Sequence, residues 1–245
     1  MGARLPLSGV AVLDLTRLLP GPLATRHLAE LGATVTKVEG PAADGQQDGS
    51  RSLFATPAEA EAGEPSLMFR TLNAGKALLE IDLRSPAGRE ALLARAQAAD
   101  VLVEGFRPGV MARLGLGWEV LHALNPRLVL CSISGYGQSG AWAQRAGHDV
   151  NYIAMSGVLE QIATVQGEPA LPNFQIGDLM GGAQAAVSAV LAALFAAQRD
   201  GQGRHLDVSM THELHRHHVL AAVTRAASGR DPEPRSEEHT SELQS

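Results

Sequence analysis

Residues 10–39, VAVLDLTRLLPGPLATRHLAELGATVTKVE, decide the fold of this chain. The apolar run at 10–15 is typical of a buried strand, and ATVTKVE at 33–39 has the same character. Between them, the proline-glycine-proline sequence at 20–22 opens a helical segment that Gly32 ends. A strand, a helix and a second strand in this order form a βαβ unit, which predicts a parallel sheet with a right-handed crossover.

Strands and helices alternate along the rest of the chain. Apolar, strand-like runs recur at 78–83, 100–105, 127–134 and 206–210. Helical patterns lie between them, and the longest is an Ala-rich segment over 179–198. By contrast, residues 40–66 are rich in small and polar side chains without a steady period, which predicts a mobile surface loop. The alternation as a whole predicts the α/β fold class.

The carboxyl ends of the strands are where a ligand is expected, because open α/β sheets bind ligands beyond that edge. Polar or charged residues follow the strands at 16–17, 37–39, 104–107 and 134–138. Lys37 and Glu39 end the second strand, where such folds usually meet a nucleotide, although exposed strand-end charges would give the same pattern. The first crossover lacks G-x-G-x-x-G, so a dinucleotide is not indicated.

Composition excludes several classes of protein. The chain has 245 residues, 45% of them hydrophobic, and a formal net charge of −6. These values suit one large globular domain and give no reason to expect a nucleic-acid partner. The most apolar run, 181–197, contains Gly, Gln and Ser, so we expect a buried core helix and no membrane association. Cys131 is the single cysteine, which argues against a disulfide framework and predicts a cytoplasmic protein.

Two groups able to move protons, His148 and Asp178, lie in the central segment of the chain. Asp178 stands where a loop turns into the Ala-rich helix, with Gly181 and Gly182 in the first turn. A carboxylate there has helix N–H dipoles nearby, and glycines let a ligand approach the backbone. The alternative interpretations are structural: Asp178 is a helix N-cap, His148 is a polar turn residue, and Asp149 hydrogen-bonds turn backbone.

A histidine-rich segment, THELHRHH at 211–218, is the other conspicuous cluster. Pairs of its histidines lie three residues apart, and such pairs share a helix face that could bind zinc. The pattern is not H-E-x-x-H, and no cysteine or further ligand is spaced to complete a site. We therefore expect no metal and interpret the segment as a polar helix face.

The last residues, RSEEHTSELQS at 235–245, differ in kind from the rest of the chain. They are polar, break the α/β alternation and look like an in-frame translation of a sequencing-library adapter, so we predict a disordered artefact there. A natural disordered acidic tail is the alternative. On this interpretation residues 229–234 are a linker, and the natural protein continues past about Pro234.

Seven stretches occur in the order of one known family: LDLTRLLPGPLATRHLAELGATVTKVE, LNAGKALLEIDL, ADVLVEGFRPGVMARLGLG, SISGYGQSG, AGHDVNYIAMSG, IGDLMGG and RDGQGRHLDVSM. Together they resemble the family III (CaiB/BaiF-type) CoA-transferases, the group that also contains α-methylacyl-CoA racemase. The resemblance implies a Rossmann-like large domain, present but incomplete over residues 1–228, and a small domain that is mostly missing. It also implies that the full-length protein is an interlocked homodimer.

The resemblance assigns chemistry to two residues. Asp178 in IGDLMGG matches the family's catalytic aspartate, and His148 in AGHDVNY matches the histidine of the racemases. A racemase moves the α-proton of an acyl-CoA with two acid–base groups on opposite faces, and the backbone near Gly181 and Gly182 would stabilise the enolate oxygen. The histidine favours racemase-like epimerisation. CoA transfer through an aspartyl-CoA at Asp178 is the alternative, and an inactive CoA-binding fragment is a third.

The resemblance also implies a binding site for coenzyme A, which would enter as part of the acyl-CoA substrate. The residues it points to are Lys37, Leu72, Asn73, Lys76, Phe106, Arg107 and Arg113. Basic side chains suit this ligand because charge-assisted hydrogen bonds to phosphate are strong. Ala77 departs from the family pattern, which usually has a second basic residue there, and this weakens one expected phosphate contact.

Overall fold

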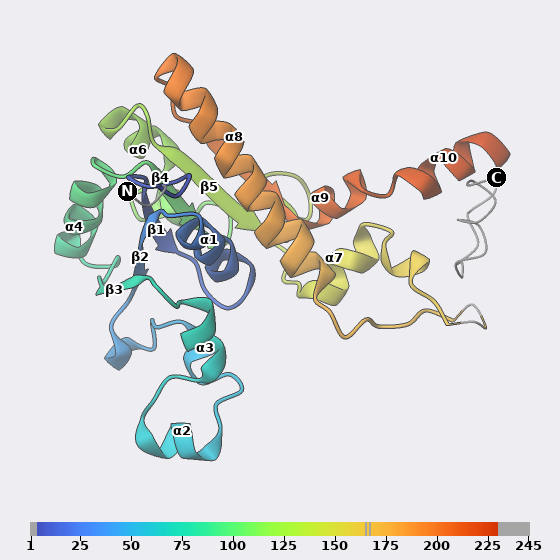
Figure 1. Ribbon diagram of the computed structural model, residues 1–245, viewed down its shortest axis with the longest axis horizontal. Helices are drawn as coiled ribbons and strands as arrows, with labels where there is room; N and C mark the ends of the chain where they lie inside the picture. Colours follow the sequence, from blue (N-terminus) through green and yellow to red (C-terminus); the bar gives the residue numbers. More distant parts are fainter. Residues whose placement is uncertain (1–3, 165, 167, 230–245) are drawn as a thin grey trace.

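A computed structural model describes residues 4–164, 166 and 168–229 of the chain. Within these residues one sheet has six parallel strands in the order β3-β2-β1-β4-β5-β6 (Figure 1). The strands are β1 (Ala11–Leu15), β2 (Thr34–Glu39), β3 (Ala77–Glu80), β4 (Val101–Glu104), β5 (Val129–Ser134) and β6 (His205–Ser209). The predicted α/β class and parallel sheet are confirmed, and the strand order is that of the Rossmann fold.

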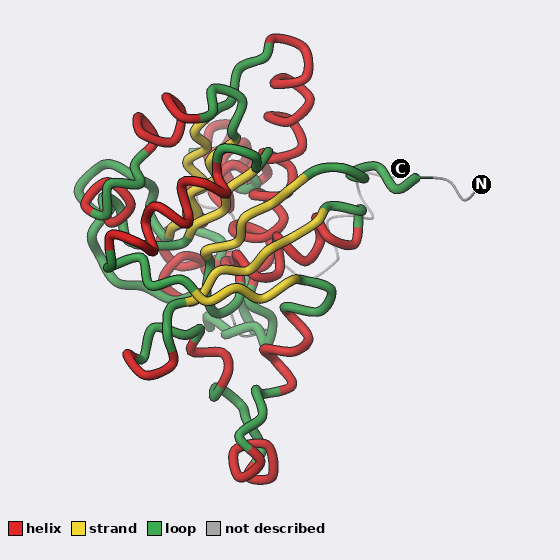
Figure 2. The backbone as a smooth tube through the Cα atoms, turned by 90° about the vertical axis from the view of Figure 1, so that its left-hand side faces the viewer, coloured by secondary structure: helices red, strands yellow, loops and turns green. Residues whose placement is uncertain are grey.

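Helices cover both faces of the sheet, as Figure 2 shows. Helices α1 (Pro20–Glu30) and α8 (Ala185–Asp200) pack on one face, and α4 (Pro86–Ala96), α5 (Val110–Arg113) and α6 (Trp118–Leu124) pack on the other. Successive strand residues point to opposite faces. In β4, accordingly, Val101 and Val103 pack with α1 and α8, whereas Leu102 packs with the other three helices.

The segment predicted as a mobile surface loop, 40–66, has more local structure than its composition indicates. It contains two short 3-10 turns, η1 (Ala42–Asp44) and η2 (Gly49–Arg51), and the helix α2 (Pro57–Ala62). A capping box between Thr56 and Glu59 starts α2, which explains why a helix forms in a stretch without hydrophobic periodicity. Asp48 is buried against the sheet, so the prediction of a surface loop is wrong for that part.

The remaining helices are short and connect or follow the strands. They are α3 (Leu67–Leu72), α7 (Asp149–Met155), the 3-10 turn η3 (Leu159–Gln161), α9 (Met210–Arg216) and α10 (Val219–Ser228). In Figure 1, α10 projects away from the sheet. Residues 230–245, where we predict a linker and an artefact, lie outside the described part of the chain.

The Ala-rich helix begins earlier than predicted and begins irregularly. A π-helical segment, η4 (Gly177–Gln184), runs directly into α8. Among the described residues, the stretch Gly177–Asp200 alone has the length and composition of a membrane span. Its buried side chains pack against the sheet and α1, as those of a core helix do, so it does not indicate a membrane protein.

Candidate active site

A cavity of about 380 Å³, called here the central cavity, opens at the carboxyl ends of β1, β4 and β5. Strands β1 and β4 are neighbours in the sheet although two strands separate them in sequence, so the strand order reverses between them. Open α/β sheets bind ligands at such a point. The cavity is lined by 16–21, 105–108, 133–135, 143, 145–148, Tyr152, Asp178 and Met210.

Asp178 lies at the start of η4 and is half-buried in the wall of the central cavity. Burial raises the pKa of its carboxyl group to about 6; the negative charge of Asp149 adds to the effect, and His148 opposes it. At pH 7 the Asp178 carboxyl is therefore mostly ionised but close enough to its pKa to take up and release a proton. Such tuning is typical of acid–base groups in enzymes.

Asp149 caps the helix that carries Asp178. Its Oδ1 accepts the backbone N–H of Asp178 at 2.9 Å, and a Cβ atom at Gly177 would lie 2.9 Å from the same oxygen. The residue at the N-cap position is Ile176, so the interpretation of Asp178 as an ordinary N-cap is wrong. Asp149 does bond backbone, as expected, but in the distant η4 segment and not in its own turn.

His148 stands at the N-cap position of α7 and lines the same cavity as Asp178. Its backbone N–H donates to Asn151 Oδ1 at 2.9 Å, which fixes the start of the helix. Tyr152, one turn further along α7, donates its hydroxyl to the Gly147 carbonyl. Burial and the charge of Asp178 raise the pKa of Tyr152 to about 12, so this donor keeps its proton. The structure therefore brings His148 and Asp178 together.

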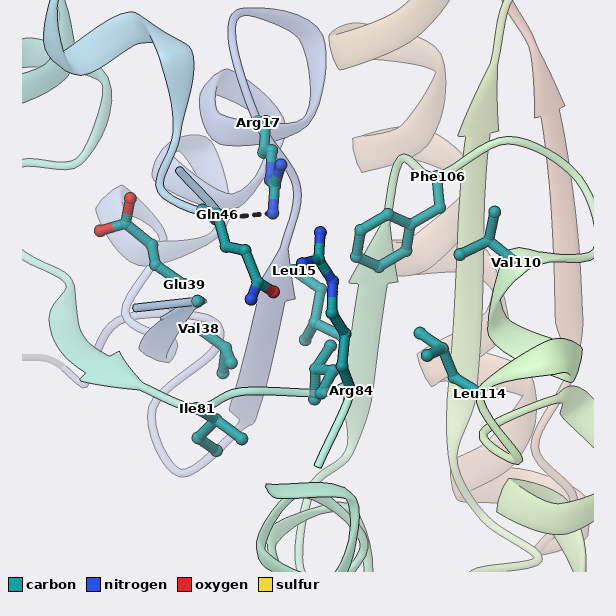
Figure 3. A pocket seen from close by; sticks show the side chains of 12 residues that line it. Leu15, Arg17, Val38, Glu39, Gln46, Ile81, Arg84, Phe106, Val110 and Leu114 are labelled. Atoms are coloured by element: carbon teal, nitrogen blue, oxygen red, sulfur yellow. Dashed lines mark hydrogen bonds between the residues drawn. The ribbon is translucent and has the colours of Figure 1, made fainter. Parts of the chain in front are cut away.

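A second cavity of about 250 Å³, the side cavity, adjoins the first through Arg17 and Phe106, which line both. Figure 3 shows the guanidinium groups of Arg17 and Arg84 and the ring of Phe106 around it. Its floor is apolar, with Leu15, Val38, Ile81, Leu83, Val110 and Leu114. Glu39 also lines the side cavity, but it is ion-paired with Arg51. An apolar surface bordered by arginines suits a ligand that has both an aromatic ring and negative charge.

Four arginines border the two cavities without a carboxylate partner. They are Arg17, Arg84, Arg107 and Arg145, and none of the ion pairs found among the described residues includes them. Arg17 donates to the Gln46 carbonyl at 2.6 Å, and Arg107 donates to the Gln144 carbonyl at 2.7 Å. The two adjoining cavities are together called the groove. Because these bonds do not neutralise the guanidinium charge, the groove attracts anions.

Lys37 and Lys76, both expected to contact coenzyme A, have fully buried side chains outside the two cavities. Lys37 Nζ lies 3.0 Å from Asp48 Oδ2 and donates to the Thr16 carbonyl at 2.7 Å. Lys76 Nζ lies 2.9 Å from Asp14 Oδ2. Burial acts to raise the pKa of Asp14, but the charges of Lys76 and Lys37 outweigh it and hold this pKa below its usual value.

These ion pairs support the wall of the central cavity. Asp48, the partner of Lys37, accepts the backbone N–H of Leu18 at 2.9 Å through Oδ1. Leu18 lines the cavity with a φ of 66°, a conformation that leucine rarely adopts and that the surrounding bonds must hold. Through Asp48, the charge of Lys37 thus helps to hold the turn after β1 in place.

The other residues expected to bind coenzyme A divide into two groups. Phe106 and Arg107 line the central cavity, as the resemblance implies. Leu72 is a core residue, and Asn73 bonds Lys76 Nζ and the Phe69 carbonyl within the protein. Arg113 is exposed at the end of α5 and lines neither cavity.

Gly181 and Gly182 serve helix packing in this structure. A Cβ atom on Gly181 would lie 2.6 Å from the Met210 carbonyl oxygen, and one on Gly182 would lie 2.7 Å from Pro20 Cβ. Both glycines are buried outside the central cavity, between η4 and the helices α9 and α1. Neither glycine lines the central cavity, and their predicted role in stabilising a substrate oxygen stays a prediction.

The histidine-rich segment has internal partners. His215 Nδ1 lies 3.2 Å from the Ser156 carbonyl, and His217 Nδ1 lies 2.7 Å from the Glu213 carbonyl. The rings of His215 and His218 are 6.4 Å apart. Across residues 4–164, 166 and 168–229, no group of three or more His, Cys, Asp or Glu side chains is placed to hold a metal ion.

Sequence reasoning missed three residues of the groove: Arg84, Arg145 and Tyr152. Tyr152 follows His148 by one helical turn, so the two share a helix face, and this spacing was a usable signal. Arg84 and Arg145 lie in irregular segments, where no periodic pattern predicts which way a side chain points. Only the folded chain brings them to the groove.

Taken together, the fold and the site define an α/β protein with a cationic ligand groove at the strand-order reversal of a parallel sheet. The sequence model of "CoA-transferase family III" matches residues 7–244. The chain belongs to this family, whose members are enzymes acting on CoA thioesters. The match extends through the tail, so the artefact at 235–245 stays a prediction.

Curated relatives include both kinds of enzyme considered above. The chain is 37% identical to succinate–glutarate CoA-transferase of Agrobacterium fabrum over 84% of its own length and 51% of that protein. It is also 37% identical to human alpha-methylacyl-CoA racemase, over 83% of the chain and 48% of that protein. The chain thus spans about half the length of the curated relatives it matches.

A solved structure agrees with the fold. The crystal structure of a CaiB/BaiF family protein from Brucella suis superposes with a TM-score of 0.85 at 31% identity. The superposition covers 94% of this chain and 60% of that one. The described residues therefore correspond to part of the longer chain of that protein.

Proposed function

We propose that this chain carries the acid–base site of an acyl-CoA enzyme and that its reaction is epimerisation at the α-carbon of a 2-methylacyl-CoA. The observation that carries the proposal is the placement of His148 and Asp178 in one cavity, beside a groove bordered by arginines. One group removes the α-proton and the other returns a proton to the opposite face of the carbon. Asp178, with its pKa raised to about 6, is suited to both steps near neutral pH.

The groove supports a position for the coenzyme. The adenine ring would lie on the apolar floor of the side cavity beside Phe106, and the phosphates would bond Arg17, Arg84 and Arg107. The thioester would then extend along the central cavity towards Asp178 and His148. In this arrangement Lys37, Asn73 and Lys76 act on coenzyme A indirectly, by holding the turn after β1.

CoA transfer between carboxylic acids is the second candidate, supported by the similarity to the CoA-transferase of Agrobacterium fabrum. Here the Asp178 carboxylate attacks the thioester carbonyl, and the CoA thiolate leaves as a mixed anhydride forms. The thiolate then attacks the aspartyl carbonyl, which releases the first carboxylate and leaves an aspartyl-CoA thioester. A second carboxylate takes over the coenzyme by the reverse of these steps. His148 would have no required role as a base.

The whole-protein properties follow the family resemblance. We propose that the natural protein is longer than this chain, is cytoplasmic, and forms an interlocked homodimer in which the small domain completes the site. If that completion is essential, the 245-residue chain is a CoA-binding fragment without activity. Comparing it with the longer natural reading frame separates these outcomes.

The test is exchange of the α-proton in deuterated water. The 245-residue chain and the longer natural protein are each incubated with a 2-methylacyl-CoA, and deuterium at the α-carbon is followed by mass spectrometry. The variants are His148→Ala, Asp178→Asn and, as the control, the exposed Asp200→Asn. Exchange that both site variants lose and the control keeps supports epimerisation. Exchange absent in the natural full-length protein, together with Asp178-dependent passage of CoA to an added carboxylate and inactivation by hydroxylamine, favours transfer instead.

A further inference from the structure

Glu104 is a buried carboxyl group that the proposed reaction does not use. It is the last residue of β4, is only 4% exposed, and stands between Leu15 of β1 and Ser132 of β5. The next residues, Gly105 and Phe106, begin the turn that lines the central cavity. Glu104 is therefore directly beneath the segment in which we place coenzyme A.

Hydrogen bonds connect Glu104 to this turn on one side and to the edge of the sheet on the other. Its Oε2 accepts the backbone N–H of Phe106 at 2.7 Å, and the Ser132 hydroxyl bonds the same carboxyl group. Ser132 Oγ in turn lies 2.9 Å from His205 Nε2 on the edge strand β6. The ring of Trp118 stacks on His205, with 5.7 Å between centroids.

The charged groups that act on this chain of bonds are acidic. Asp207 of β6 acts on Glu104 as a like charge, and Glu119 of α6 acts on His205. Burial raises the pKa of the neighbouring Cys131 thiol, which stays protonated, and lowers the pKa of His205, which favours the neutral ring. Burial, partly opposed by the bonds from Ser132 and the Phe106 N–H, raises the pKa of Glu104 to about 7.

We propose that Glu104 is a positioning residue for the CoA-binding turn at 105–108, and that the proton on Glu104 controls how well this turn accepts the polyanionic coenzyme. The inference rests on the proposed binding of acyl-CoA. With its proton, Glu104 donates to Ser132 Oγ, and Ser132 donates to His205 Nε2. The Phe106 N–H keeps its acceptor, and Glu104 itself adds no charge beneath the turn.

Loss of the proton reverses the chain of bonds. Ser132 then donates to the Glu104 carboxylate, and the Nε2–H tautomer of His205 donates to Ser132. The new negative charge lies at the base of the turn that carries Arg107, where it weakens the attraction for the CoA phosphates. By linkage, bound CoA favours the protonated form of Glu104 to the same extent.

The experiment is calorimetric titration of the wild-type chain and Glu104→Gln with CoA at pH 6 and pH 8. Glutamine is the neutral mimic, because its carbonyl accepts from Phe106 and its amide donates to Ser132 at both pH values. We expect the wild-type affinity to fall about three- to tenfold more than that of Glu104→Gln over this range, consistent with one added charge near the phosphates. Ionisation of CoA itself affects both proteins equally. Glu80→Gln, an exposed glutamate at the end of β3, is the control and should follow wild type.

Equal pH dependence in wild type and Glu104→Gln would overturn the inference. Failure of every protein to bind CoA at either pH would overturn the proposed function as well, so the two failures are distinguishable. If Glu104→Gln does not fold, ¹⁵N NMR of His205 in the wild type gives the answer. We expect its Nε2 to change from acceptor to donor between pH 6 and 8 in wild type but not in Ser132→Ala, and an unchanged tautomer would contradict the proposal.

Discussion

The molecule carries two sets of cations that differ in what surrounds them. Lys37 and Lys76 are buried beneath the turn after β1, each within 3.0 Å of a carboxylate. Arg17, Arg84, Arg107 and Arg145 border the groove above that turn, and no ion pair among the described residues uses them. The first set stabilises the platform on which the second set binds a ligand, so a basic residue near a site need not contact the substrate.

The largest expected effect comes from removing a buried lysine, and it is on stability. Replacing Lys76 by Met leaves Asp14 buried without its nearest cation, and we expect the free energy of unfolding to fall by about 3–5 kcal/mol. Urea denaturation followed by circular dichroism measures it. The double variant Lys76→Met/Asp14→Asn removes the unpaired charge and should recover part of the loss. A single variant as stable as wild type would contradict the assignment of Lys76 to the platform.

The same pair gives a pH dependence of stability. The pKa of Asp14 is lower in the folded protein than its ordinary value of 3.8, so its stabilising contribution is complete above that pH and is lost as the pH falls through the folded value. We expect Asp14→Asn to flatten the loss of unfolding free energy below about pH 4, with denaturation curves from pH 6 to pH 3 as the measurement. An unchanged acid profile would show that Asp14 is not held ionised by Lys76.

A smaller effect is expected where the helix of Asp178 packs on α9. Gly181→Ala places a methyl group 2.6 Å from the Met210 carbonyl oxygen, and we expect a loss of about 1–3 kcal/mol in unfolding free energy. Ser188→Ala, an exposed position on α8, is the matched control and should change it by less than about 0.5 kcal/mol. If Gly181→Ala instead kept full stability and abolished α-proton exchange, the glycine would belong to the substrate site after all.

The smallest effect concerns the pKa of Asp178. In Asp149→Asn, the side-chain carbonyl oxygen can still accept the backbone N–H of Asp178, but the negative charge that raises the pKa of Asp178 is removed. The pKa of Asp178, about 6 in the wild type, should therefore fall towards its ordinary value, and the acid limb of the pH–exchange profile should shift to lower pH. A shift to higher pH would contradict the like-charge explanation.

Local sequence patterns predicted the scaffold well because they act over short distances. The apolar runs and proline–glycine signals of residues 10–39 gave the first βαβ unit, and its repetition gave the parallel sheet. The patterns failed for 40–66, where the buried Asp48, just before η2, is paired with Lys37 of β2. Burial of this charge depends on a partner in a different element of the fold, and no sequence period reveals such a pairing.

The site was predicted only in part, because local patterns indicate where a residue lies but not what its side chain contacts. His148, Asp178, Phe106 and Arg107 are in the groove as expected, since strand ends and helix starts determine where they lie. The roles expected for Lys37, Lys76, Gly181 and Gly182 depended on which way each faces. The structure turns all of them towards packing or ion pairs within the protein.

The most direct test of the difference between the two sets of cations is a paired measurement on Arg107→Ala and on wild type. CoA affinity is followed by calorimetric titration, and unfolding free energy by urea denaturation. Arg204→Ala, at a half-buried arginine that lines neither cavity, is the matched control. We expect Arg107→Ala to weaken CoA binding by about tenfold or more, because it removes charge-assisted bonds to phosphate, and to change stability by less than about 0.5 kcal/mol. Unchanged CoA affinity, or a loss of stability like that of Lys76→Met, would contradict the account.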